Sequence, residues 1–141
     1  MPSSPDLRAS LIALTPEAKA ALGGAELVIA RLPFRVGRES RRRPHAAGRT
    51  IAERRKPKRP PTNELYLVEK GEPFNVSRDH FQIQHNGTRY ILVDRQSACG
   101  TIVEGAVVGG RGAGGAVQLN DGDVIVVGTS GSPYVFKFRV R

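Results

Sequence analysis

Two short polar segments contain side chains suited to binding a doubly charged anion. Arg38 ends the first segment, 36–38, and Ser77 and Arg78 lie in the second, 76–81. A phosphate group is held best by a planar guanidinium fork, a short hydroxyl donor and a second cation that converge on it. Arg38, Ser77 and Arg78 supply these three groups. They therefore predict a phosphate site, provided that the chain folds so that the two segments meet.

Other chemistries have less support in the sequence. Ser77 and His80 could act as nucleophile and base, but there is no Gly-x-Ser-x-Gly turn and no evident acid to orient the histidine. Residues 110–115 match Gly-x-Gly-x-x-Gly, yet they lead toward a turn at 120–122 instead of the helix that a dinucleotide site requires. The three histidines and one cysteine lack paired metal-ligand spacing. We expect a non-catalytic protein without metal or cofactor.

Length and cysteine content limit the class of protein. A chain of 141 residues fits one domain with one ordinary core. Its single cysteine, Cys99, cannot form a bridge within the chain, so folding must depend on apolar burial, which suits a reducing compartment. No stretch approaches the roughly 18 apolar residues of a membrane span, and the first residues lack the features of a signal peptide. We expect a cytoplasmic protein without membrane contact.

The positive charge is concentrated in one segment. The net charge is +9, and 39–62 accounts for +7 of it, with nine Lys or Arg residues against two acids. This segment has hardly any large apolar residue, so we expect a disordered insertion loop. Residues 41–59 could be simply solvated, could attract an acidic or multiply phosphorylated protein, or could bind nucleic acid. The lack of aromatic residues in the loop argues against stacking on bases.

The remaining sequence predicts many short strands and one short helix. Thr15 and Pro16 are typical of a helix start, and Gly23 is typical of a helix end, so we expect a helix through Leu22. Alternation of apolar and polar residues, together with turn residues, predicts the strands: 8–14, 26–30, 33–37, 63–67, 124–128 and 134–140. Such a pattern favours a β-sandwich.

A hairpin is expected between 80 and 94. Asn86 and Gly87 are the pair that favours a two-residue type I′ turn, in which both residues have positive φ. This turn predicts a register that places four apolar side chains on one buried face: Phe81 opposite Leu92, and Ile83 opposite Tyr90.

Three motifs in chain order resemble those of the forkhead-associated (FHA) family. Gly37-Arg38, Ser77-Arg78-Asp79-His80 and Ser97-Ala98-Cys99-Gly100-Thr101 stand where the family has G-R, S-R-x-H and S-x-N-G-T. The likeness extends from about Leu27 to Val140. It implies an all-β sandwich of the SMAD/FHA type, with two twisted sheets, about 11 strands and at most one short helix. The implied organisation is a flexible tail at 1–6 and a single domain at 7–141, with the basic insertion at 39–62.

The resemblance also implies a function. FHA domains bind phosphothreonine-containing segments of partner proteins and act as adaptors in kinase signalling. By resemblance, Arg38 and Ser77 would bind the phosphate and Arg78 would assist them. His80, Gly37 and Gly100 would support the loops, and residues 98 and 99 would contact the main chain of the ligand.

Cys99 departs from the family pattern. It stands where the family has an asparagine that holds the ligand main chain, and a thiol is too weak a donor and acceptor to replace a carboxamide. The ligand could be bound more weakly, be held differently, or lose its dependence on phosphate. The alternative function is therefore an FHA-fold scaffold with weakened phospho-specificity, which uses 41–59 to bind an acidic protein or nucleic acid.

Overall fold

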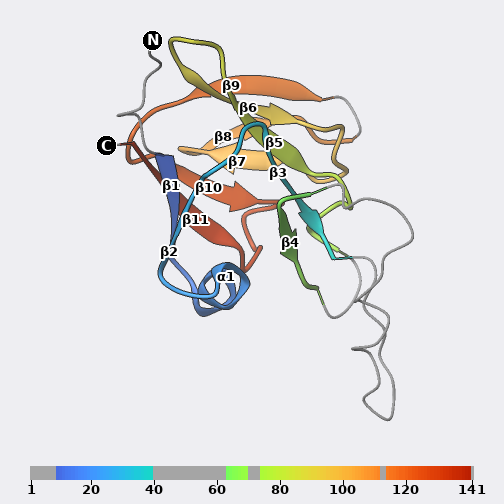
Figure 1. Cartoon of the computed structure of the whole chain (residues 1–141). Helices are drawn as coiled ribbons and strands as arrows, with labels where there is room; N and C mark the ends of the chain where they lie inside the picture. Colours follow the sequence, from blue (N-terminus) through green and yellow to red (C-terminus); the bar gives the residue numbers. More distant parts are fainter. Residues whose placement is uncertain (1–8, 40–62, 70–73, 112–113, 141) are drawn as a thin grey trace, which may run out of the picture.

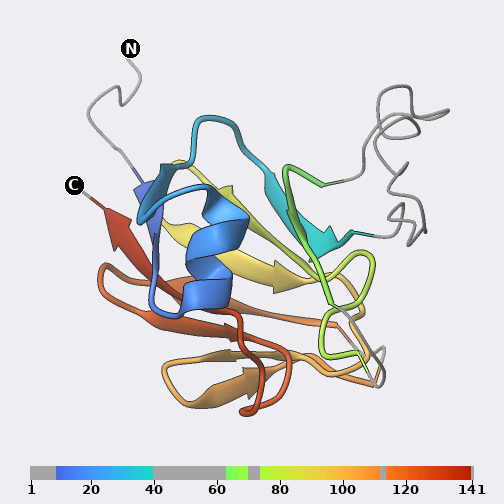
Figure 2. The same cartoon turned by 90° about the horizontal axis from the view of Figure 1, so that it is seen from below.

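Two β-sheets packed face to face form the molecule. The computed structural model describes residues 9–39, 63–69, 74–111 and 114–140 (Figures 1 and 2). One sheet has the strand order β2-β1-β11-β10-β7-β8 and the other β4-β3-β5-β6-β9. The strands are β1 Ala9–Ala13, β2 Glu26–Val28, β3 Phe34–Arg38, β4 Leu65–Leu67, β5 Phe81–His85, β6 Tyr90–Asp94, β7 Thr101–Val103, β8 Ala106–Val108, β9 Gly115–Leu119, β10 Val124–Val127 and β11 Val135–Val140. This confirms the predicted sandwich.

The one helix among the described residues, α1 (Pro16–Leu22), lies against β1, β2 and β4 (Figure 1). It begins as the sequence predicts, because the Thr15 hydroxyl accepts a hydrogen bond from the Ala18 N–H at 3.1 Å. It ends at Gly23, whose φ of +78° is the left-handed conformation that glycine adopts at low cost.

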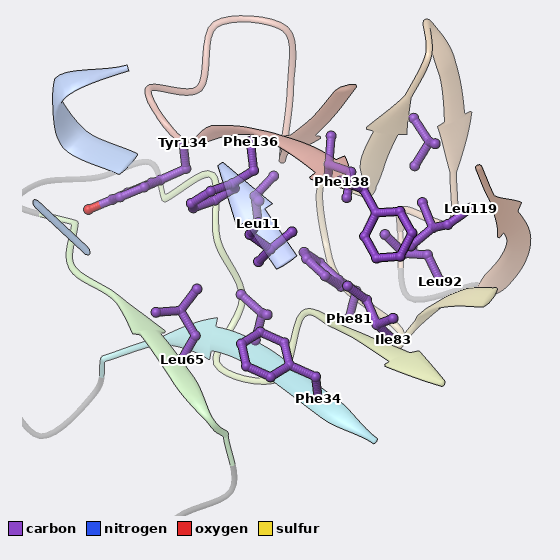
Figure 3. Close-up of a cluster of buried hydrophobic side chains, with 14 of the residues drawn as sticks. Leu11, Phe34, Leu65, Phe81, Ile83, Leu92, Leu119, Tyr134, Phe136 and Phe138 are labelled. Atoms are coloured by element: carbon purple, nitrogen blue, oxygen red, sulfur yellow. The ribbon is translucent and has the colours of Figure 1, made fainter. Parts of the chain in front are cut away.

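Inward-facing side chains of both sheets fill the core (Figure 3). The largest fully buried ones are phenylalanine, leucine and isoleucine: Phe81, Phe136, Phe138, Leu11, Leu67, Ile83, Leu92 and Ile125. They come from alternate positions of strands in both sheets, so the period-2 pattern of the sequence specifies which face of each strand is buried.

The hairpin of β5 and β6 has a different register from the predicted one. Ile83 pairs with Leu92 and His85 with Tyr90, which is a shift of two residues. The predicted turn is wrong because Asn86 does not have the positive φ that type I′ requires. Its side-chain oxygen instead accepts the N–H groups of Thr88 and Arg89, both at 2.9 Å. A shift of two preserves the faces, so the predicted burial of the four apolar residues is confirmed.

A type I′ geometry occurs elsewhere, between β7 and β8. Glu104 and Gly105 have φ values of +48° and +84° and connect Val103 directly to its partner Ala106. The glycine-rich segment 110–115 leads into β9, so a strand follows where a dinucleotide site would need a helix.

Some predictions fall outside the described residues. These include the tail at 1–6 and, except for Glu39, the insertion at 39–62. Within the described part of the chain, no helix is long and apolar enough to cross a membrane. The same residues contain no cluster of three or more His, Cys, Asp or Glu side chains that could hold a metal ion.

Candidate functional site

The end of β3 and two loops meet at one end of the sandwich (Figure 2). The loops are 74–80, before β5, and 95–100, between β6 and β7. The backbone N–H of Arg38 donates to the Ser77 carbonyl at 2.9 Å. The N–H of Ala98 donates to the Ser77 hydroxyl oxygen, also at 2.9 Å. Three distant parts of the sequence therefore converge at Ser77.

The Arg38 guanidinium is fixed on one edge and one face. Its Nε donates to the Val76 carbonyl at 3.1 Å. Its central carbon lies 4.2 Å from the centroid of the Phe74 ring, which is a cation–π contact. Among the described residues, no acceptor bonds the two terminal nitrogens, Nη1 and Nη2. Their N–H groups remain for a ligand.

Ser77 also retains a donor. Its oxygen accepts from Ala98, but none of the described residues accepts the hydroxyl hydrogen. The side chain is only partly buried, so an incoming ligand can reach it. A hydroxyl with its oxygen already bonded is well suited to donate its hydrogen to an anion.

His80 connects the two loops through its two ring nitrogens. It is fully buried. Its Nδ1 accepts from the Ser77 N–H at 2.9 Å, and its Nε2 lies 2.7 Å from the Gly100 carbonyl. This pairing fixes the neutral tautomer with hydrogen on Nε2. Burial lowers the pKa of His80, and the Gly100 carbonyl only partly opposes this shift. The imidazole therefore holds the loops together and brings no positive charge.

Gly37 allows a close approach of two backbones. A Cβ at this position would lie 1.9 Å from the Arg78 carbonyl oxygen and 2.6 Å from Asn63 Nδ2. No side chain fits there. The glycine of this motif is thus required by the distance between β3 and the 74–80 loop. Gly100 has a φ of +79°, a conformation that favours glycine in the other loop.

Arg78 and Cys99 take less direct positions. The Arg78 side chain is exposed, and its carbonyl accepts from Asn63 Nδ2 at 2.9 Å. The Cys99 thiol is partly buried and donates to the Phe74 carbonyl, with 3.6 Å between sulfur and oxygen. The structure thus brings Arg38, Ser77 and Ala98 together, while the Arg78 guanidinium lies at the surface and the Cys99 thiol bonds the protein itself.

Comparison with known protein families finds one match. A sequence model of the FHA domain matches residues 35–128, which include all three motifs. The chain belongs to the FHA domain family. No curated protein matches this FHA domain in sequence.

Solved structures share the fold. The kinase-interacting FHA domain of the kinase-associated protein phosphatase KAPP of Arabidopsis has a TM-score of 0.59 at 22% identity, with 95% of this chain and 93% of that one covered. Full-length yeast Pml1p has a TM-score of 0.62 at 17% identity, with 100% and 87% covered. EmbR of Mycobacterium tuberculosis, in complex with a low-affinity phosphopeptide, has a TM-score of 0.55 at 23% identity. The match to EmbR covers 94% of this chain but only 24% of EmbR.

Two residues that stabilise the loops of this FHA domain escaped the sequence analysis. Asn63 is 5% exposed and links the Arg78 carbonyl to the Arg95 guanidinium, which donates to Asn63 Oδ1 at 2.9 Å. Glu69 accepts the N–H groups of Asn75 and Val76 at 3.1 and 2.8 Å. Asn63 bonds residues 15 and 32 positions later, and Glu69 bonds residues six and seven positions later; no repeating pattern in the sequence reveals either set of contacts.

A third contact has a sequence signal that could have been used. Asp94 accepts the N–H and the hydroxyl of Ser97, and Ser97 Oγ accepts the Gly100 N–H at 2.9 Å. An aspartate followed three residues later by serine is typical of a side-chain-capped turn. This turn fixes the path of the 95–100 loop in the FHA domain.

Proposed function

We propose that this FHA domain binds a phosphothreonine-containing segment of a partner protein and serves as a non-catalytic adaptor in cytoplasmic kinase signalling. One observation carries the proposal: the backbones of Arg38 and Ser77 are joined at 2.9 Å, while both side chains retain unbonded donors among the described residues. Membership of the FHA family and the phosphopeptide bound by the structurally similar EmbR support it.

The proposed roles follow from the donors that remain. Arg38 Nη1 and Nη2 donate charge-assisted hydrogen bonds to phosphate oxygens, and the Ser77 hydroxyl donates a third. Exposed Arg78 adds positive charge at the rim, where it attracts a dianion before contact. His80 stays neutral, and together with Gly37 and Gly100 it maintains the loop positions. A pocket for the threonine methyl group would give the preference for phosphothreonine over phosphoserine.

We propose that the phosphate provides an unusually large share of the affinity. The Ala98 N–H is bonded to Ser77, its carbonyl accepts from Arg111, and the Cys99 thiol is bonded to Phe74. These residues have fewer groups to offer to the ligand main chain than an asparagine would have.

Calorimetry with peptides that differ only at one threonine tests this function. The phosphothreonine peptide should bind more tightly than its phosphoserine counterpart, and the unmodified peptide should not bind measurably. Arg38→Ala should reduce affinity by at least about 10- to 150-fold, because it removes both charge-assisted hydrogen bonds of the guanidinium and each one contributes about 1.5–3 kcal/mol. Equal binding of all three peptides, or an Arg38→Ala variant that binds as the wild type does, would refute the proposal.

A second candidate function rests on Cys99 and on the +7 charge of 39–62. In this version the FHA fold is a scaffold, and 41–59 binds an acidic protein or nucleic acid. Deletion of 41–59 separates the two. If the deletion abolishes salt-sensitive binding to heparin or RNA while phosphopeptide binding stays intact, the protein has both binding activities, and they reside in separate parts of the chain. If the wild type binds neither polyanion, this second function is wrong.

A further inference from the structure

Phe74 touches two of the residues that the proposed site contains, although it belongs to none of the family motifs. Its ring lies under the Arg38 guanidinium, with 4.2 Å from the guanidinium carbon to the ring centroid. Its carbonyl oxygen accepts from the Cys99 thiol. Through these contacts one residue of the 74–80 loop joins the end of β3 to the 95–100 loop.

The segment that carries Phe74 is itself firmly held. Glu69 accepts the N–H groups of Asn75 and Val76, and the Asn75 side-chain oxygen accepts the Thr129 hydroxyl at 2.7 Å. The Val76 side chain is 1% exposed and belongs to the hydrophobic core. The ring thus rests on a backbone that has little freedom to move.

The contacts of Arg38 with this segment restrict its guanidinium in two directions. The Phe74 ring covers one face, and the Val76 carbonyl takes the Nε donor. A long side chain normally loses rotational freedom when it binds an anion, and that loss weakens binding. Here the restriction exists before the ligand arrives. The ring also removes water from one face, which strengthens hydrogen bonds made by the opposite edge.

We infer that Phe74 is a positioning residue of the phosphate site, whose ring orients the Arg38 guanidinium so that Nη1 and Nη2 meet the phosphate. The inference rests on the proposed function, since it concerns the same site. Phe74 does not belong to the buried core cluster, so the ring is not needed to fill the interior. Its contribution is the aromatic face, which an aliphatic side chain lacks.

The test compares Phe74→Leu, which retains apolar bulk, with Phe74→Tyr, which retains the aromatic face. Val107→Ala is a control, since Val107 is 67% exposed on β8, the edge strand of the other sheet. The probe is N-acetyl-phosphothreonine methylamide, titrated by NMR. Phe74→Leu should weaken binding by about two- to thirtyfold, the range expected for loss of a cation–π contact. Phe74→Tyr and Val107→Ala should bind within about twofold of the wild type.

A second readout does not depend on the ligand. In the free wild type the Arg38 side-chain protons should resonate upfield, because they lie over a ring, and Phe74→Tyr should preserve this shift while Phe74→Leu abolishes it. The same Arg38 shifts in wild type and Phe74→Leu would overturn the inference. Equal probe affinities of the wild type and Phe74→Leu would also overturn the inference, but they would leave the proposed function intact. No binding of the probe by the wild type would overturn the proposed function and this inference with it.

Discussion

Gly37→Ala tests how closely β3 approaches the 74–80 loop. The added Cβ would lie 1.9 Å from the Arg78 carbonyl oxygen, and Cβ contacts below 3.0 Å essentially never occur, so the carbonyl must move by at least 1.1 Å. Overpacking of this kind costs about 1–3 kcal/mol. Loss of the Asn63–Arg78 hydrogen bond adds about 1 kcal/mol. We therefore expect a destabilisation of about 2–4 kcal/mol, which most domains survive.

The same displacement should also impair the site. Arg78 follows Ser77 directly, so a shift of about 1 Å in the Arg78 carbonyl should also displace the Ser77 hydroxyl relative to Arg38. A phosphate held by Arg38 would then lie beyond hydrogen-bond distance of that hydroxyl. We expect phosphopeptide affinity to fall by about 10- to 150-fold, the equivalent of one charge-assisted hydrogen bond.

Urea unfolding followed by circular dichroism measures the stability change, and calorimetry measures binding. Gly24→Ala is a matched control, because nothing lies within 4 Å of its Cβ position and its φ is not positive. This variant should be as stable as the wild type or slightly more stable, since alanine restricts the unfolded chain. A Gly37→Ala protein that unfolds at the wild-type urea concentration and binds phosphopeptide equally well would refute the reasoning.

Three further predictions concern the loops. Cys99→Asn should raise phosphopeptide affinity by about two- to tenfold in calorimetry, because a carboxamide adds hydrogen bonds to the ligand main chain; unchanged or lower affinity would contradict this. Ser97→Ala should destabilise the domain by about 1–3 kcal/mol in urea unfolding, because the buried Gly100 N–H loses its acceptor. The pKa of His80 is lowered in the folded state, so only the unfolded chain gains a proton as the pH falls below about 6.5. Stability should thus fall with pH below that value, and His80→Gln should show a shallower decrease over the same range.

Sequence patterns predicted the elements well where the determinants are local. Thr15 and Gly23 fix the ends of α1 through contacts within a few residues, and alternation alone specified the buried faces of β5 and β6. The register of that hairpin was predicted wrongly, because two backbone N–H groups bond the Asn86 side chain and form a different turn. The Asn-Gly pair is compatible with both turns, so the sequence does not show which one forms.

The contacts around the candidate site were harder to predict because they join distant residues. Asn63 bonds the Arg95 guanidinium, 32 positions later in the sequence, and Phe74 stacks on an arginine 36 positions earlier. Neither contact has a period or a fixed spacing. The motifs indicated Arg38 and Ser77 as partners, but the means by which their backbones are joined became visible only in three dimensions.

The bonding pattern of the loops explains why the proposed ligand is an anion. His80 is satisfied by Ser77 and Gly100, and the Asp94 and Glu69 carboxylates bond groups of their own loops. At Arg38 and Ser77 the groups left over are donors, and one of them is permanently charged. A ligand must therefore bring several acceptors and negative charge to the same point. A neutral hydroxyl brings one acceptor and no charge, whereas a phosphate brings three acceptor oxygens and nearly two charges, which is why phosphorylation should switch binding on.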